Sequence, residues 1–393
     1  MEMKSNILKT IGLGLSFAAL TACSDWVTPE PVFRDEDRHY NENIQSPADQ
    51  EYFASLRKWK ETPELPQVFV WFDSWSGSSN TGSESLRALP DSVTIASNWG
   101  LHGADTTKFD LSESRKYDMD ILQRVKGTKL VYTMFSRFPG EGLPRSRYPH
   151  WYDESGNYIY FRNSNEASNK DPEAVRPYLR RYAEDLYHAC VETGYDGYDW
   201  DFEPGFGMGD RYDAQLWYNE TQCQIFVEEM SYWFGRYAMD PTRDRGGRPM
   251  PEKRLLFLID GAIGWYRMCG METKYFDYFI LQAYHATTKY DCENRVKGAI
   301  DEIKEFCSDE ISDAEIVKRI ILTENFESYA STGGGCLVQS QYIHDPVDQQ
   351  IGGCGLYRVG FDYDRGKQSY NFLPQMITNI YSIWRDRQNN KEE

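Results

Sequence analysis

The chain has 393 residues, enough for one large domain or two ordinary ones, and its formal net charge is −18. Phosphate binding needs a basic surface, and because no block rich in Lys or Arg occurs, the composition argues against nucleic acid as a partner. Aromatic residues make up 15% of the chain, which suits either sugar-binding surfaces or a large aromatic core.

Residues 1–22 have the pattern of a signal peptide. Lys4 and Lys9 precede a short apolar run at 11–20, and Leu20-Thr21-Ala22 stands directly before Cys23. This junction resembles a bacterial lipobox, so we expect Cys23 to be lipidated and to anchor the protein to the outer membrane, at the cell surface or the periplasmic face. The alternative is a plain secretory signal cut near the same place. No later segment is apolar enough to cross a membrane, so we expect membrane contact through the lipid alone.

Residues 23–60 mix Asp, Glu, Pro, Asn and Arg without apolar periodicity, which predicts a linker between the anchor and a single domain at 61–393. The odd number and scattered positions of the remaining cysteines make a zinc site unexpected. We expect most of them to be buried apolar side chains, with export also allowing one or two disulfides. They are Cys190, Cys223, Cys269, Cys292, Cys307, Cys336 and Cys354.

Short apolar runs alternate with longer amphipathic stretches along the domain. We predict strands at 68–72, 93–97, 129–135, 195–203, 255–259, 278–284, 319–323 and 355–361, and the clearest helices at 172–192, 214–237, 296–306 and 374–387. Strands that alternate with helices imply a parallel sheet, and eight of them favour an α/β fold closed as a (β/α)8 TIM barrel. A doubly wound open sheet is the structural alternative.

One connection is too long for an ordinary loop between a strand and its helix. It runs from 138 to 168, after the third strand, and loops at that end of a barrel surround the site of chemistry. We therefore expect a wall that shapes the substrate site, with an insertion folded against the body as the alternative. Its notable side chains are Arg145, Arg147, Trp151, Tyr152, Tyr158 and Tyr160.

The fourth predicted strand carries an unusual density of carboxylates, in the stretch YDGYDWDFEP at 195–204. Side chains alternate between the faces of a strand, so Asp199, Asp201 and Glu203 share one face, with successive acids about 6–7 Å apart. The aromatic residues between them share the other face and can pack against the barrel helices. The acids then point into the barrel and rise toward its active end.

Three carboxyl groups inside a barrel cannot all ionise freely, because desolvation and like charges raise some of their pKa values. Such a split between protonated and charged acids suits glycoside hydrolysis. Two other interpretations exist: a solvated face of an antiparallel sheet, and a Ca²⁺ or Mg²⁺ site, since hard cations take carboxylate oxygens. We expect neither, and predict no metal and no cofactor.

The stretch from Asp196 to Glu203 fits D-G-x-D-x-D-x-E and resembles the strand-four signature of glycoside hydrolase family 18. That family holds chitinases and endo-β-N-acetylglucosaminidases on (β/α)8 barrels. The resemblance implies that Glu203 is the general acid/base and that Asp201 orients the 2-acetamido group of the substrate, which acts as the nucleophile. It implies that Asp199 exchanges a proton with Asp201. Asp196 and Gly197 complete the motif, and we assign Asp196 a structural role because it faces the other side.

A second stretch bears on the subfamily. Chitinases of this family typically carry Met-x-Tyr-Asp on strand six, whereas this chain has Gln282 and Tyr284 in a Gln-x-Tyr pattern without the Asp. The pattern resembles the endo-β-N-acetylglucosaminidase branch, whose members cut between the two GlcNAc residues of an N-glycan core. It implies that Tyr284 binds the acetamido carbonyl and that Gln282 contacts the same sugar. Alone, these two residues also fit an ordinary buried strand.

Residues at other strand ends are further candidates for substrate binding. We select Asp73 after strand one, Asn98 after strand two, Phe135 at the end of strand three and Tyr357 on strand eight. Trp75, Trp99, Arg137, Glu324, Asn325, Asp362 and Tyr363 are weaker candidates. Many relatives line the sugar with a Trp on strand eight, and none lies near 355–365, so we expect Tyr357 or Tyr363 in its place or a floor built differently.

The sequence therefore predicts a retaining glycoside hydrolase that works by participation of the substrate's acetamido group. The expected substrate is a GlcNAc-containing glycan or glycoprotein, above all the GlcNAc-β1,4-GlcNAc core of N-glycans. The alternatives are a chitinase-type hydrolase and a non-catalytic glycan-binding protein on the same barrel. We expect the protein to be a monomer.

Overall fold

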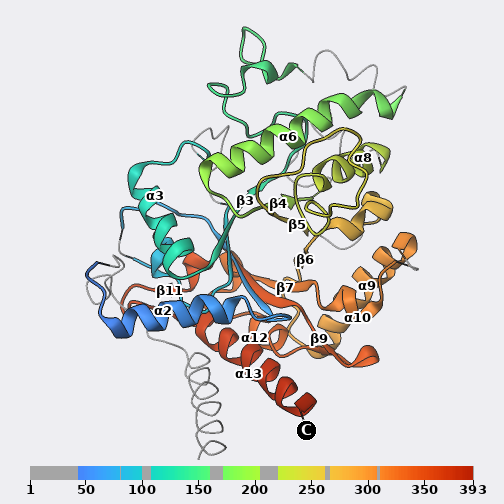
Figure 1. Ribbon diagram of the computed structural model, residues 1–393. Coiled ribbons are helices and arrows are strands. Elements are labelled where there is room, and N and C mark those ends of the chain that lie inside the picture. Colours follow the sequence, from blue (N-terminus) through green and yellow to red (C-terminus); the bar gives the residue numbers. More distant parts are fainter. Residues whose placement is uncertain are drawn as a thin grey trace, which may run out of the picture.

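The computed structural model describes residues 43–79, 81–99, 108–159, 171–203, 220–261, 266–307 and 310–392. Eight parallel strands form a closed barrel in the order β1-β10-β7-β6-β5-β4-β3-β2, with helices around it (Figure 1). This is the predicted (β/α)8 TIM barrel. The barrel strands are β1 (Gln67–Phe72), β2 (Ile95–Asn98), β3 (Lys129–Met134), β4 (Gly197–Asp201), β5 (Leu256–Gly261), β6 (Tyr278–Leu281), β7 (Ile320–Asn325) and β10 (Gly353–Tyr357).

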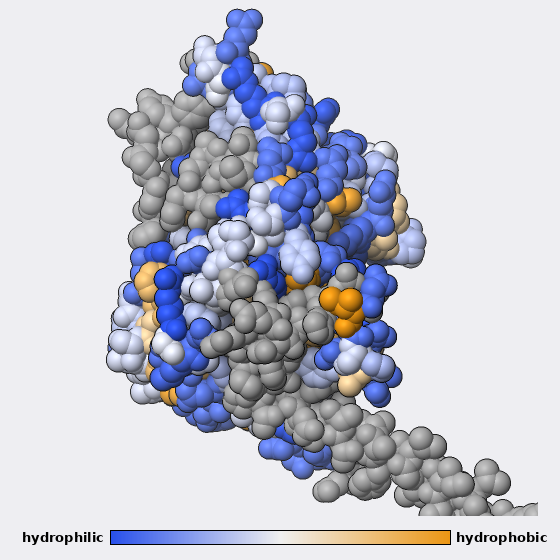
Figure 2. Space-filling view, turned by 90° about the vertical axis from the view of Figure 1, so that its left-hand side faces the viewer, coloured by the Kyte–Doolittle hydropathy of each residue, from blue (hydrophilic) through white to orange (hydrophobic). Residues whose placement is uncertain are grey.

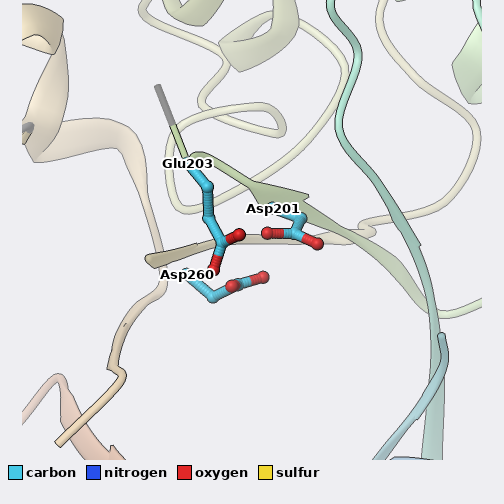
Figure 3. Close-up of side chains that lie close together, drawn as sticks. All are labelled: Asp201, Glu203 and Asp260. Atoms are coloured by element: carbon cyan, nitrogen blue, oxygen red, sulfur yellow. The ribbon is translucent and has the colours of Figure 1, made fainter. Parts of the chain in front are cut away.

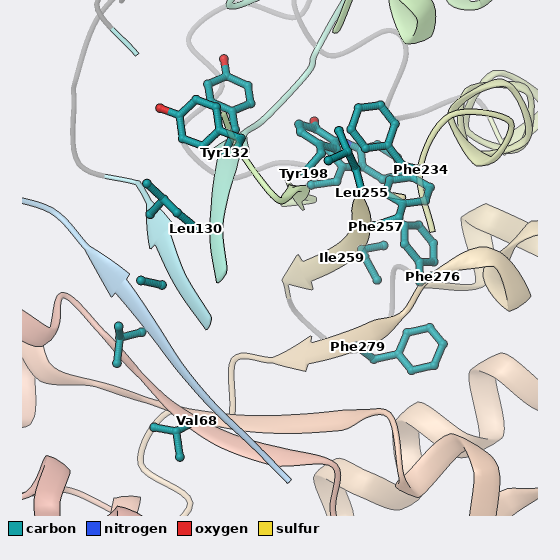
Figure 4. Packing of buried hydrophobic residues seen from close by; sticks show 14 of the residues in the cluster. Val68, Leu130, Tyr132, Tyr198, Phe234, Leu255, Phe257, Ile259, Phe276 and Phe279 are labelled. Carbon is teal, nitrogen blue, oxygen red and sulfur yellow. The ribbon is translucent and has the colours of Figure 1, made fainter. Parts of the chain in front are cut away.

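Each barrel strand is buried on both faces, which explains the nearly continuous apolar runs in the sequence. One face fills the barrel interior with a small cluster that includes Phe69, Trp71 and Ile95. The other face packs against the helices in a larger cluster, part of which is drawn in Figure 4. Two pairs of short antiparallel strands lie outside the barrel: β8 (Ile343–His344) with β9 (Gln349–Gln350), and β11 (Tyr363–Asp364) with β12 (Ser369–Tyr370).

The surrounding helices follow the prediction at four places. They are α6 (Arg176–Thr193), α8 (Glu220–Ser231), α9 (Lys289–Cys307) and α13 (Leu373–Glu392). The start predicted for α8, at residue 214, lies outside the described residues. Gly194 ends α6 with a φ of 98°, a left-handed conformation that glycine adopts without strain. Further helices are α3 (Glu113–Asp120), which continues into the π-helical η5 (Ile121–Val125), and α10 (Asp313–Val317), α11 (Phe326–Tyr329) and α12 (Cys336–Gln339). Single turns or short 3-10 segments are η3 (Leu86–Ala88), η6 (Pro149–Trp151), η7 (Pro172–Val175), η8 (Tyr266–Tyr275), η9 (Asp345–Val347) and η10 (Val359–Asp362).

The predicted linker at 23–60 is too long, because helix α2 (Pro47–Lys60) belongs to the folded body. Ser46 caps the helix with its hydroxyl oxygen, which accepts a hydrogen bond from the Asp49 amide. Phe53, Leu56 and Trp59 then recur every three residues on one side and are buried in the large cluster. The polar side chains between them hid this spacing in the sequence.

The long connection after β3 packs against the body over its described part, up to residue 159. Trp151 is buried and its indole Nε1 donates to Asp185 of α6 at 2.8 Å, and the Tyr152 hydroxyl donates back to the Leu143 carbonyl. These contacts match the interpretation of this connection as an insertion that folds against the body. Tyr160, another of its predicted residues, lies outside the described residues. Cys23 also lies outside them.

All seven later cysteines are buried free thiols, so the disulfides that export would allow are not formed between them. Within the described part of the chain, no helix combines the length and the apolarity needed to span a bilayer. Hydrophilic side chains dominate the described surface on the face drawn in Figure 2.

Candidate active site

Strand β4 separates its acids from its aromatics as the alternation predicted. Tyr198, Trp200 and Phe202 are fully buried in the large cluster toward the helices. Asp199 and Asp201 are buried at 0% and 5% exposure on the inner side, where Asp199 accepts hydrogen bonds from the neighbouring strand β3 and from β1 across the barrel. Burying aromatic rings on the outer face fixes the strand, and the strand in turn holds carboxyl groups in the barrel.

Asp199 lies deepest in this carboxyl column. Its Oδ2 accepts hydrogen bonds from the Thr133 hydroxyl at 2.9 Å and from the Trp71 indole Nε1 at 3.1 Å. Burial raises the pKa of Asp199 to about 7, against these hydrogen bonds, which favour the charged form. Near neutral pH the Asp199 carboxyl group is therefore partly protonated.

Asp201 lies one step closer to the barrel mouth. Burial raises the pKa of Asp201 well above its ordinary value, and the negative charges of Glu203 and Asp199 raise it further. The Trp99 indole donates to Asp201 Oδ2 at 3.4 Å, and Lys108 lies near enough to oppose the shift. The Lys108 ammonium is held by the carbonyl oxygens of Trp99 and Thr133 at 3.0 and 3.1 Å.

Glu203 follows the end of β4 and is half-buried at the mouth. The Gln282 amide Nε2 donates both to Glu203 Oε1 and, at 3.2 Å, to Asp260 Oδ1. Burial raises the pKa of Glu203, and the hydrogen bond from Gln282 opposes that rise. The carboxyl group of Glu203 is therefore held in place by the Gln282 amide.

Asp260 was missed in the sequence because the fifth strand was predicted to stop at Ile259. It lies on β5 directly opposite Asp201 and is 1% exposed. Carboxyl oxygens of Asp201, Glu203 and Asp260 come within 4.8 Å of one another, and Figure 3 shows the three groups turned toward a common point. Three such oxygens could hold a divalent cation, and the Gln282 amide donates hydrogen bonds to two of these carboxyl groups, Glu203 and Asp260.

Aromatic rings surround the carboxyl column at the mouth. Tyr284 and Tyr357 stack with ring centroids 6.1 Å apart, and Trp99 meets Tyr357 edge-on at 4.9 Å. Burial and then the charges of Asp260, Glu203 and Asp201 raise the pKa of Tyr284 well above its ordinary value, which places Tyr284 beside these acids. Tyr357 on strand eight, one of the two residues expected in place of the Trp of many relatives, therefore lies at the mouth of the column. Tryptophans reach the acids from β1 and from just beyond the end of β2.

Three predicted binding residues do not join this group by any contact of the described residues. Ile95 and Ser97 point inward, so Asn98 points outward, where its amide Nδ2 donates to the Tyr195 hydroxyl at 2.6 Å. Its neighbour Trp99 takes the inner position. The alternation of inward and outward side chains along the strand was the signal that could have distinguished Trp99 from Asn98.

Asp73 and Phe135 are engaged elsewhere. Asp73 is 8% exposed and pairs with the Arg358 guanidinium at 2.7 Å. Phe135 packs against the large outer cluster, and its carbonyl oxygen accepts from the Trp200 indole at 2.7 Å.

Asp196 and Gly197 have the structural roles that the sequence suggested for the motif. Asp196 Oδ2 accepts from the Leu130 amide and the Gln123 side chain, and Oδ1 pairs with Lys253 at 3.0 Å. Gly197 approaches β5 so closely that a Cβ would lie 2.6 Å from the Leu256 Cβ. Both residues fix β4 against its neighbours.

The fold and this carboxyl column define a barrel of the glycoside hydrolase class. A family profile described as "Glycoside hydrolase family 18, BT1044-like" matches residues 38–379. The chain belongs to that family. No curated protein sequence matches the chain.

Solved structures agree on the fold. A structure titled BT1044, in a form with glutamine in place of one glutamate, has a TM-score of 0.62 at 23% identity, covering 88% of this chain and 97% of its own. An endo-β-N-acetylglucosaminidase from Cordyceps militaris, bound to fucosyl-N-acetylglucosamine-Asn, has a TM-score of 0.51 at 13% identity, covering 88% of this chain and 98% of its own. The apo form of the fungal enzyme has a TM-score of 0.51 at 15% identity, covering 87% of this chain and 98% of its own.

Proposed function

We propose that the protein is a retaining glycosidase that cleaves GlcNAc-containing glycans with help from the substrate's own acetamido group. The observation that carries the proposal is the inner column of Asp199, Asp201 and Glu203, in which Gln282 holds Glu203 and burial raises the pKa values of the three acids. General acid catalysis needs a protonated carboxyl group at neutral pH, and burial of Glu203 favours that form.

In the first step the acetamido carbonyl oxygen attacks the anomeric carbon and the glycosidic C–O bond breaks. Glu203 gives its proton to the leaving oxygen, and Asp201 bonds the acetamido N–H and stabilises the positive charge of the ring that forms. A water molecule then attacks the same carbon, loses its proton to Glu203 and reopens the ring, so the configuration is retained without a covalent enzyme intermediate. Asp199 can take or supply the proton that Asp201 exchanges, because its pKa is about 7.

For the substrate we propose the GlcNAc-β1,4-GlcNAc core of N-glycans. Gln282 and Tyr284 lie at the column in the Gln-x-Tyr pattern, and the stacked rings of Tyr284 and Tyr357 offer an apolar face for a sugar. The Cordyceps militaris endo-β-N-acetylglucosaminidase was solved with fucosyl-N-acetylglucosamine-Asn, in a variant in which an Asp and a Glu two positions apart are replaced by their amides. Asp201 and Glu203 have the same spacing.

Incubation with high-mannose, hybrid and complex glycoproteins, followed by mass spectrometry, tests this substrate. We expect a single GlcNAc to remain on the protein and the glycan to be released with the other. Asp201→Asn should slow this cleavage by about 10²-fold or more, because it weakens stabilisation of the positive ring. Release of chitobiose from chitin oligomers in place of N-glycans would assign the chitinase alternative, and glycan binding without any product would assign the non-catalytic one.

We also propose that Cys23 is lipidated and that the protein is anchored in the outer membrane. The support is the Leu20-Thr21-Ala22-Cys23 sequence. Metabolic labelling with a fatty acid should mark the parent and not Cys23→Ser, and the variant should leave the membrane fraction. Equal labelling of both proteins would refute the assignment, and antibody access on whole cells would separate the cell surface from the periplasmic face.

A further inference from the structure

A fourth carboxyl group, outside the D-G-x-D-x-D-x-E motif, lies against the acids of β4. Asp260 stands opposite Asp201 on the neighbouring strand and in hydrogen-bonding contact with Asp199. Gln282 joins Asp260 to Glu203 through one amide nitrogen. Asp260 therefore touches every acid of the column either directly or through one side chain.

Two carboxylates in hydrogen-bonding contact require a proton between them, because an ionised carboxylate can only accept. One oxygen each of Asp199, Asp201 and Asp260 is buried without a hydrogen-bond donor from the described residues. A proton carried by Asp260 supplies such a donor inside the cluster. Leaving these oxygens unpaired would be costly in so deeply buried a site.

The local charges indicate which group carries the proton. Burial raises the pKa of Asp260 well above its ordinary value, and the charges of Asp201, Asp199 and Glu203 all add to that rise. The cation Lys108 acts on Asp201 and lowers the pKa of that group. The titratable groups that act on Asp260 directly are Asp199, Asp201, Glu203 and Tyr284. Lys108 acts on the adjacent Asp201, and Tyr357 lies near Asp201 and Glu203.

We propose that Asp260 is a positioning residue of this site: as a neutral carboxylic acid it donates to Asp199 and accepts from Gln282, whose amide then holds Glu203. This inference rests on the proposed glycosidase function. The acid stays protonated through the cycle, so it adds no negative charge beside Glu203. Asp260 keeps the side chains of Gln282 and Asp199 in place.

Asp260→Asn and Asp260→Leu separate this role from simple packing, because both side chains keep the branched shape of Asp. The Asn amide can donate to Asp199 and accept from Gln282, whereas Leu can do neither. We expect Asp260→Leu to lower kcat by about 10²-fold through misplacement of Glu203, with KM changed little. Asp260→Asn should recover at least tenfold of that loss, with the alkaline limb of its pH–rate profile at the same pH as in the parent.

Equal losses of kcat in the two variants would overturn the proposal. A shift of the alkaline limb to lower pH by about one unit in Asp260→Asn would also overturn it, because such a shift would mean that the substitution had removed an ionised Asp260. Thermal unfolding of both variants checks that each is folded.

A carboxyl titration tests protonation without activity. With ¹³C in the carboxyl groups of aspartate, the signal missing from Asp260→Asn should stay at the protonated position at pH 7 in the parent. A missing signal that titrates near pH 4 would refute the protonated state. If the parent cleaves no glycan, the proposed function fails, and the titration still decides the state of Asp260.

Discussion

Replacing Asp199 by Asn should make the protein more stable at neutral pH while damaging its site. The pKa of Asp199 in the folded protein is about 7, against an ordinary value of 3.8. An acid whose folded pKa is raised contributes stability in full below the unfolded pKa, and that stability is lost as the pH rises through the folded value. Asn cannot titrate, so the variant escapes this loss.

The size of the effect follows from the shift. About three pKa units at about 1.4 kcal/mol each give at most about 4 kcal/mol. The Asn side chain can still accept from Trp71 and Thr133, which limits any loss of hydrogen bonding. The difference in unfolding free energy between variant and parent should be near zero at pH 4, grow through pH 5–7 and level off at pH 8.

Urea unfolding at unit steps from pH 4 to pH 8 measures this difference directly. Asp240→Asn is the matched control, because Asp240 is an exposed carboxyl whose pKa is lowered by its hydrogen bonds with Thr242. Its difference from the parent should not grow with pH. If the Asp199→Asn difference stays flat or falls between pH 4 and pH 8, Asp199 is an ordinary ionised carboxylate and the shared-proton account is wrong.

Two further variants probe the body and the mouth of the site. Leu56→Ala should reduce the unfolding free energy by about 2–5 kcal/mol, since Leu56 is fully buried on the inner side of α2. An unchanged urea midpoint would mean that α2 is a spacer. Tyr357→Ala should raise KM for an N-glycan by about tenfold, because it removes a ring that stacks on Tyr284, and steady-state kinetics with an unaltered KM would exclude Tyr357 from sugar binding.

The barrel could be predicted because each strand is buried on both faces and so stands out as a short apolar run. Helix α2 could not be recognised as easily, since three buried residues, Phe53, Leu56 and Trp59, are embedded among charged ones. Strand ends were also imprecise. The eighth strand was predicted at 355–361, whereas β10 is Gly353–Tyr357 and a 3-10 turn follows it.

The acids of β4 could be predicted because alternation along one strand fixes which side chains share a face. Relations between strands could not be predicted in the same way. That Asp260 lies opposite Asp201, and that Trp71 reaches Asp199 from β1, depends on the register of the closed sheet. Asn98 was chosen over Trp99 because the alternation of inward and outward side chains along β2 was not followed to the end of the strand.

The most direct test of the glycosidase account is the rate at which Glu203→Gln releases glycan from an N-glycosylated protein, with products read by mass. Gln has nearly the same shape and can still bond to Gln282, but it has no proton to give, so we expect cleavage to fall by about 10²–10⁴-fold in a protein that unfolds like the parent. Cleavage by Glu203→Gln at the parent's rate would contradict the account.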